Sequence, residues 1–111
     1  MSKAKLLRIH FSERDKYRGA PLYEAIVSKC REMRIAGATV FRGLEGYGEN
    51  AEIHRRHIMD HDQPIIVVVV DIEERINDLI PVIESMMETA VIATSEVEMI
   101  RVQRSSVESR K

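Results

Sequence analysis

The alternation of apolar and polar residues predicts two strands in the first half of the chain. In residues 4–11, one face carries Leu7, Ile9 and Phe11, and the other face carries Leu6, Arg8 and His10. A period of two is typical of a strand with one buried face. Residues 38–45 form the second predicted strand, in which the adjacent Val40 and Phe41 point to opposite faces.

The second half of the chain predicts two more strands. The run P-I-I-V-V-V-V-D at residues 64–71 is so uniformly aliphatic that we expect both of its faces to be buried. Residues 91–93 are interpreted as a short apolar link, and residues 96–102 alternate as the fourth strand. Residues 103–111 are polar, and we expect a frayed tail.

An apolar stripe at helical spacing predicts a first helix over residues 21–35, after a polar turn at residues 12–19. Pro21 suits the first helical position, where its missing N–H costs nothing, and Gly37 is the predicted stop signal. The stripe contains Leu22, Ile26, Cys30 and Met33, with Tyr23 and Val27 widening it.

A second helix is predicted from residue 72 onward. Asp71 is placed to cap its start, and Glu74 three residues later completes a pair that resembles a capping box. Pro81 falls inside the apolar stripe, so we expect it to kink or break the helix near residues 77–80. The stripe consists of Ile72, Ile76, Leu79, Ile80, Ile83 and Met87.

This order of elements predicts an α+β fold of the ferredoxin-like βαββαβ type. Its expected form is a four-stranded antiparallel sheet with two helices on one face. A chain of 111 residues is one domain by size, so we expect a single domain over residues 1–111 with an ordered core at residues 4–102. The polar connection at residues 47–63 is long for so small a domain, which is typical of a functional or mobile loop.

The predicted sheet indicates an oligomer. Two helices cover only one face of such a sheet, yet residues 64–71 are apolar on both faces. Soluble monomers rarely expose a contiguous aliphatic patch, and residues 47–63 are too polar to cover one well. We therefore expect the second face to be buried against other copies of the chain, in an assembly with closed cyclic symmetry.

The composition excludes several classes of partner. A formal net charge of −1 produces no field that would draw the chain to nucleic acid or to an anionic membrane. No apolar run approaches the length of a membrane span. The single cysteine, Cys30, cannot form an intrachain disulfide and suits a reducing compartment, so we expect a cytoplasmic protein.

The stretch G-A-T-V-F-R-G-L-E-G-Y-G at residues 37–48 is the main candidate for a ligand site. Three closely spaced glycines mark either a well-packed hairpin corner or a close backbone approach to a ligand, and the spacing leaves both open. Exposed backbone N–H groups there could hold an anion. Arg8, Arg42 and Arg101 are the strand arginines that could face a phosphate, and a position at a sheet edge or in a salt bridge is the alternative for each.

The histidines of the long connection are candidate metal ligands. On a helix, His54, His57 and His61 would share one face, with spacing that a metal site could use. Arg55 and Arg56 would repel a cation, however, so a solvated loop with incidental histidines is the alternative. No nucleophile has a partner that the sequence can show, and we expect no enzyme activity.

Several blocks, in matching order, resemble the PII-like family catalogued as domain of unknown function number 190. The blocks are G-A-P-L-Y-E-A-I-V at 19–27, the glycine-rich stretch at 37–48, Ile53-His54, the aliphatic strand at 64–71 and residues 76–81. The resemblance covers about residues 4–102. Gly43, Gly46, Gly48 and His54 match the family pattern best.

The resemblance implies a PII-like homotrimer that binds a small effector in clefts between subunits. The expected effector is an adenine nucleotide (ADP, AMP or ATP), and no other cofactor is required. Residues 47–63 would report its binding to a target transporter or enzyme. The expected ligand-binding residues are Arg8, Arg42, Gly43, Glu45, Gly46, Tyr47, Gly48 and His54. Two alternatives are a CutA-like trimer that binds divalent metal and a small nucleotide hydrolase.

Overall fold

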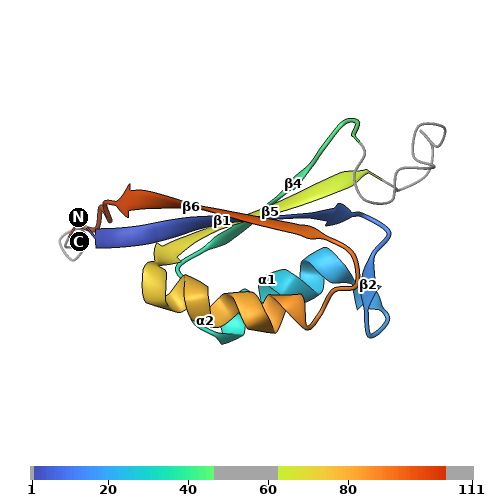
Figure 1. Cartoon of the computed structure of the whole chain (residues 1–111), viewed down its shortest axis with the longest axis horizontal. Coiled ribbons are helices and arrows are strands. Elements are labelled where there is room, and N and C mark those ends of the chain that lie inside the picture. Colours follow the sequence, from blue (N-terminus) through green and yellow to red (C-terminus); the bar gives the residue numbers. More distant parts are fainter. Residues whose placement is uncertain (1, 47–62, 105–111) are drawn as a thin grey trace, which may run out of the picture.

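A four-stranded antiparallel sheet lies over two helices, and both helices cover the same face (Figure 1). The computed structural model describes residues 2–46 and 63–104. Its elements in chain order are β1 (Ser2–Ser12), β2 (Lys16–Tyr17), β3 (Ala20–Pro21), α1 (Leu22–Glu32), β4 (Ala38–Arg42), β5 (Pro64–Ile72), α2 (Glu73–Glu84) and β6 (Val91–Met99). The sheet order β4-β5-β1-β6 confirms the predicted ferredoxin-like fold.

The core lies between the sheet and the helices. The register of β1 with β5 places Leu7 opposite Val69 and Ile9 opposite Val67, so these four side chains share the helix-facing side. All four are buried, and full burial of an aliphatic side chain contributes about 1.5–3 kcal/mol. The helices complete this core with Leu22, Ile26, Cys30, Ile76, Leu79 and Ile83.

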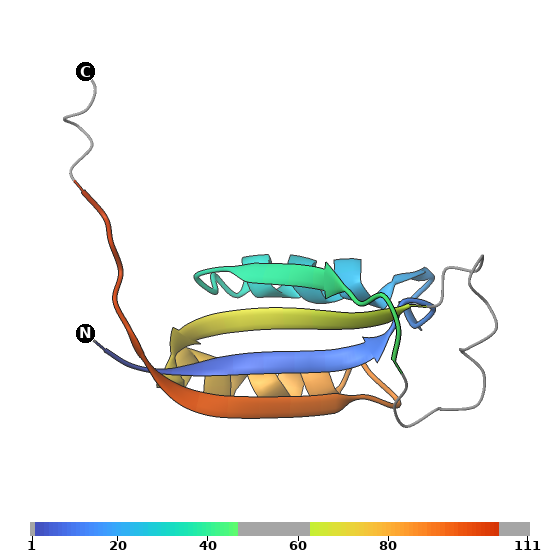
Figure 2. The same ribbon diagram turned by 90° about the horizontal axis from the view of Figure 1, so that it is seen from above.

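The other face of the sheet is mostly apolar and carries no described helix; Figure 2 views the sheet from this side. Phe41 on β4 is 53% exposed, which confirms that its side chain points away from the core. Its neighbour Val40 packs against the core. By register, Phe41 lies opposite Ile66, and Val68 lies opposite Arg8. We call this surface the open face; its apolar members are Leu6, Phe41, Ile66, Val68, Val70, Val91, Ala93 and Val97.

Helix α1 is shorter than predicted at both ends. Pro21 precedes the helix and pairs with Lys16 in a small hairpin, instead of occupying the first helical position. The helix ends at Glu32, before the predicted stop at Gly37, because Arg34 adopts a positive φ of 62°. The amide of Ile35 then donates to the Cys30 carbonyl at 2.9 Å, which closes the C-terminus in a Schellman arrangement.

The polar stretch before α1 contains a two-stranded hairpin that the sequence did not reveal. Strands β2 and β3 pair Tyr17 with Ala20. The connecting Arg18 and Gly19 both have positive φ, of 51° and 86°, as a type I′ turn requires. The ring of Tyr17 packs against the core, so this short stretch is tied to the domain.

The predicted capping box at α2 is wrong. Ile72 is the N-cap residue, and no side chain caps the helix. The carboxylate of Asp71 instead accepts hydrogen bonds from the amides of Ala36 at 2.9 Å and Ile72 at 2.7 Å. Asp71 is only 5% exposed, so its carboxylate is buried. There it satisfies a backbone amide of the α1–β4 connection.

Pro81 does not break α2, which continues to Glu84. The proline lacks an N–H and leaves the Asn77 carbonyl without its helical donor. Pro81 is exposed, so water can hydrate that part of the helix. The apolar stripe on both sides of the proline still packs on the sheet, through Ile76, Leu79 and Ile83.

Two strand boundaries differ from the prediction. Strand β4 ends at Arg42 instead of residue 45, because the next position on β5 is Pro64, which has no N–H to donate. Strand β6 begins at Val91 and ends at Met99, so the predicted link at 91–93 is part of the strand. The three polar residues at 94–96 hid this continuity, but an edge strand tolerates them.

Helix α2 has 12 residues and α1 has 11. A membrane span requires about 20 mostly apolar residues. Within residues 2–46 and 63–104, therefore, no helix is long and apolar enough to cross a membrane.

Candidate functional site

The ends of β1 and β4 and the start of β5 meet at one corner of the sheet. We call the group Glu13, Arg42, Gly43, Gln63 and Pro64 the β4–β5 corner. The Gly43 amide donates to the Pro64 carbonyl at 2.7 Å, and the Glu13 amide donates to the Gln63 carbonyl at 2.9 Å. These two bonds hold together the residues that flank segment 47–62.

An ion pair joins the two charged members of the corner. The Arg42 guanidinium donates to Glu13 Oε2 at 2.6 Å. Glu13's side chain is only 9% exposed, whereas that of Arg42 is 55% exposed. The hydrogen bond to Glu13 and its negative charge raise the pKa of Arg42 above its ordinary value. The pair thus has a buried anionic half and a cationic half that solvent reaches.

Gln63 adds further bonds at the corner. Its amide group, oriented so that the nitrogen faces backbone carbonyls, donates to Leu44 at 2.9 Å and to Gly43 at 3.2 Å. Its backbone N–H lies 3.4 Å from Glu13 Oε1. Gln63 therefore connects the Glu13 carboxylate with the backbone that follows β4.

Gly43 is required at this corner by close packing. A Cβ on Gly43 would lie 2.8 Å from Pro64 Cγ, closer than real contacts allow. A Cβ on Gly46 would lie 3.4 Å from the same atom. Of the two interpretations of the glycine cluster, this contact favours a packed corner for Gly43, because the close approach is to Pro64 of the same chain.

Replacing Gly43 by alanine is expected to destabilise the protein by about 1–3 kcal/mol, the usual cost of overpacking. The proline ring is rigid and its carbonyl is bonded to Gly43, so neither side can yield freely. Gly37→Ala is the matched control: no atom lies within 4 Å of its added Cβ. That variant should be unchanged or up to about 1 kcal/mol more stable. Urea unfolding of both variants measures the difference, and equal stabilities would contradict the packing role.

The structure does not bring the two predicted phosphate-binding arginines together within one chain. Arg8 lies in the middle of the open face, opposite Val68 and Ala93. Arg42 is paired with Ile65, on the helix-facing side of the sheet. Glu45 is exposed beyond β4. Tyr47, Gly48 and His54 lie outside the described residues.

Glu13 is the member of the corner that sequence reasoning missed. It stands in the polar run S-E-R-D after β1, where nothing distinguishes it from a solvated turn residue. Its partners are 29 and 50 positions away in the chain. Only the pairing of β1 with β5 and of β5 with β4 brings them together.

The metal-site hypothesis is untested by the structure, because His54, His57 and His61 lie outside the described residues. Among residues 2–46 and 63–104, no group of three or more His, Cys, Asp and Glu side chains could hold a metal ion. Cys30 is buried in the core, and burial raises the pKa of its thiol to about 11. At neutral pH it is therefore a thiol, as expected for a core residue rather than a nucleophile.

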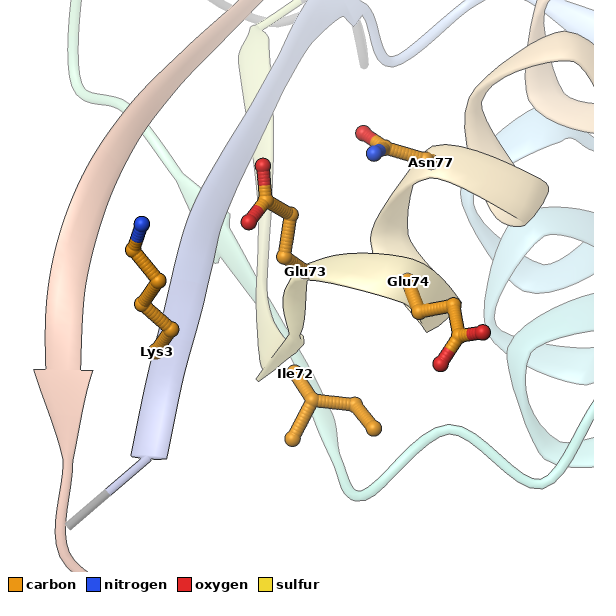
Figure 3. Close-up of a pocket in the computed structure, with 5 residues that line it drawn as sticks. All are labelled: Lys3, Ile72, Glu73, Glu74 and Asn77. Carbon is orange, nitrogen blue, oxygen red and sulfur yellow. The ribbon is translucent and has the colours of Figure 1, made fainter.

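An open hollow of about 410 Å³ lies at the opposite end of the sheet, beside the start of α2 (Figure 3). Its lining residues are Lys3, Ile72, Glu73, Glu74 and Asn77. The two glutamates stand in the first turn of α2, where negative charge complements the helix dipole. None of the predicted ligand-binding residues that the structure describes lines this hollow.

Comparison with known proteins identifies a family and curated relatives that include two UPF0166 proteins. The model of the DUF190 family, described as "Uncharacterized ACR", matches residues 4–99. A UPF0166 protein of Aquifex aeolicus is 35% identical over 100 residues, which cover 88% of this chain and 94% of the relative. A UPF0166 protein of Methanocaldococcus jannaschii is 39% identical over 85 residues, covering 73% and 76%.

Solved structures of PII-like proteins share the fold. A PII-like signalling protein of Thermus thermophilus superposes with a TM-score of 0.63 at 15% identity, covering 86% of this chain and 88% of the other. CPII of Thiomonas intermedia, a nitrogen regulatory PII-like protein bound to ADP, AMP and bicarbonate, gives 0.57 at 18% identity with the same coverage.

Proposed function

Because this chain belongs to the DUF190 family of uncharacterised proteins and has the PII-like fold, we propose that it is a regulatory protein that binds an adenine nucleotide between the subunits of a homotrimer. The observation that carries the proposal is the open face of the sheet. It requires neighbouring copies of the chain, and a ligand cleft then forms where the copies meet.

The open face supports assembly through its composition. On this face, Ile66 of the long strand β5 lies beside Phe41 of β4, and Val70 of β5 lies beside Leu6 of β1. Burying such a surface against identical copies removes it from water, and a closed ring limits the assembly to a few subunits. Three subunits are the number that the PII-like fold suggests.

The position of Arg8 is an argument for an anionic group, from a ligand or a partner, within that assembly. Among the described residues, no side chain forms a hydrogen bond or ion pair with Arg8, although it stands amid aliphatic neighbours. Once the face is buried, the guanidinium needs an anion. A phosphate of the nucleotide supplies one. CPII of Thiomonas intermedia was solved with ADP and AMP, which indicates the class of nucleotide.

Arg42 and the glycine-rich stretch form the second part of the proposed site. Arg42 is more than half exposed and lies where β4 ends. Around it we place Gly43, Glu45, Gly46, Tyr47, Gly48 and His54, contributed by one subunit beside the Arg8 of the next. Segment 47–63 would report binding to a target transporter or enzyme, with the nucleotide favouring one of two states.

Thermal unfolding with ADP, AMP and ATP, and with GDP as a control, tests the proposal. ADP at a hundred times its Kd should stabilise the protein by about 2.7 kcal/mol. Arg42→Gln should weaken ADP binding about 10- to 100-fold, because a charge-assisted bond to phosphate is lost. Arg31→Gln, on the exposed side of α1, is the matched control and should bind normally.

The same samples distinguish a regulator from a hydrolase. Chromatography of ADP and ATP after incubation should recover both unchanged. If no adenine nucleotide stabilises the assembled protein, the proposed ligand class is wrong. Steady consumption of nucleotide would instead identify an enzyme.

A further inference from the structure

We propose that Glu13 is an internal competitor for the nucleotide: it occupies the Arg42 guanidinium in the empty protein, and a phosphate group displaces it on binding. This inference rests on the proposed function, because it assigns a regulatory part to a residue outside the predicted ligand set. It makes Glu13 a positioning residue that acts through Arg42.

The first support is the asymmetry of the ion pair. Glu13 reaches Arg42 from inside the corner, with 9% of its side chain exposed, while 55% of the Arg42 side chain faces solvent. An anion from solution therefore approaches the guanidinium from the side opposite the carboxylate. Arg42 forms bonds with Glu13 alone among the described side chains, and a guanidinium has five N–H donors.

The second support is the repulsion between two anions at one cation. A phosphate bound to Arg42 would lie a few ångströms from the Glu13 carboxylate, and like charges at such distances raise each other's energy. Because Glu13 is poorly hydrated, water screens this repulsion weakly. Glu13 therefore lowers the affinity for phosphate as long as it carries its charge and keeps its place.

The third support is the connection from Glu13 to Gln63. If phosphate takes Arg42, the carboxylate loses its counter-charge in a largely buried position and has to turn toward water. Its contact with the Gln63 amide, at 3.4 Å, is then lost. Gln63 also donates to the carbonyls of Gly43 and Leu44. Binding at Arg42 thus changes the hydrogen bonds of residues on both sides of segment 47–62.

The test is the Glu13→Gln variant, which removes the charge but keeps one oxygen that can accept from Arg42, while its amide nitrogen replaces the oxygen that faces the Gln63 amide. Calorimetric titration should show ADP binding about tenfold more tightly than to the wild type, the usual difference between a charged and a neutral acceptor. Glu32→Gln is the matched control, because Glu32 pairs with Lys29 at 3.1 Å on α1, away from the corner. It should leave the affinity unchanged.

Hydrogen exchange gives a second measurement, which would not change with ADP if the role of Glu13 were purely structural. In the wild type, ADP should accelerate exchange of the Gln63 amide at least threefold; in Glu13→Gln the effect of ADP should be smaller. If the wild type binds ADP and Glu13→Gln binds it equally or more weakly, the competitor role is wrong while the proposed function stands. If neither form binds ADP, both fail.

Discussion

Replacing Val68 by lysine is expected to convert the assembled protein to folded monomers. Val68 lies at the centre of the open face, opposite Arg8 on β1 and Thr39 on β4. A second cation beside Arg8 has no anion in the described structure to neutralise it. Burying it would cost about 3–5 kcal/mol per interface, a roughly hundred- to several-thousandfold loss of association.

Sedimentation velocity at micromolar concentration measures this effect, and circular dichroism checks that the monomer is folded. The fold should survive, since an exposed strand lysine can extend its amine into water. Ser28→Lys on the exposed side of α1 is the matched control and should stay assembled. Val68→Glu should be milder than Val68→Lys, because a carboxylate there can pair with Arg8. A wild type that is already monomeric, or an assembly unaffected by the lysine, would exclude the open face as the interface.

Replacing Asp71 by alanine is expected to lower the free energy of unfolding by about 2–4 kcal/mol. The change removes the acceptor for two amides, those of Ala36 and Ile72. Because Asp71 is 5% exposed, water reaches this position poorly and replaces little of the hydrogen bonding that the two amides lose. Asp71→Asn should cost less, since its amide retains one oxygen acceptor.

Urea unfolding at one fixed protomer concentration measures the loss, because assembly and stability are linked. Asp78→Ala, at an exposed position of α2, is the control and should lie within about 0.5 kcal/mol of the wild type. If Asp71→Ala and Asp78→Ala are equally stable, the carboxylate does not hold the α1–β4 connection in place.

Local periodicity was sufficient to predict the layers of the fold. The alternation in residues 4–11 correctly separated Leu7 from Arg8, and the aliphatic run of β5 correctly indicated a strand with two apolar faces. Both depend only on neighbouring residues. The apolar character of the open face could therefore be predicted from local sequence patterns alone.

Contacts between residues that are far apart in the chain could not be predicted from the sequence. Asp71 looked like a helix cap because Glu74 follows three residues later, yet its carboxylate bonds to Ala36, 35 positions away. Glu13 looked like a turn residue because its partners, Arg42 and Gln63, are 29 and 50 positions away in the chain. In both cases the register of the sheet selects the partner, and no local pattern encodes it.

The glycine cluster illustrates the same limit. The sequence left a packed corner and a ligand cleft open, and the contact with Pro64 accounts for Gly43 without a ligand. A Cβ on Gly46 would lie farther from the same proline than one on Gly43, and Gly48 lies outside the described residues. The proposed cleft would therefore be formed by Arg42 together with a neighbouring subunit.

Native mass spectrometry of the wild type and of Val68→Lys with ADP tests the central claim most directly, namely that the nucleotide site forms between subunits. The wild type should appear at three times 12.8 kDa and carry up to one ADP per chain. The Val68→Lys monomer should carry none at the same ADP concentration. Equal ADP binding by the monomer, or a wild-type assembly that binds no ADP, would contradict the claim.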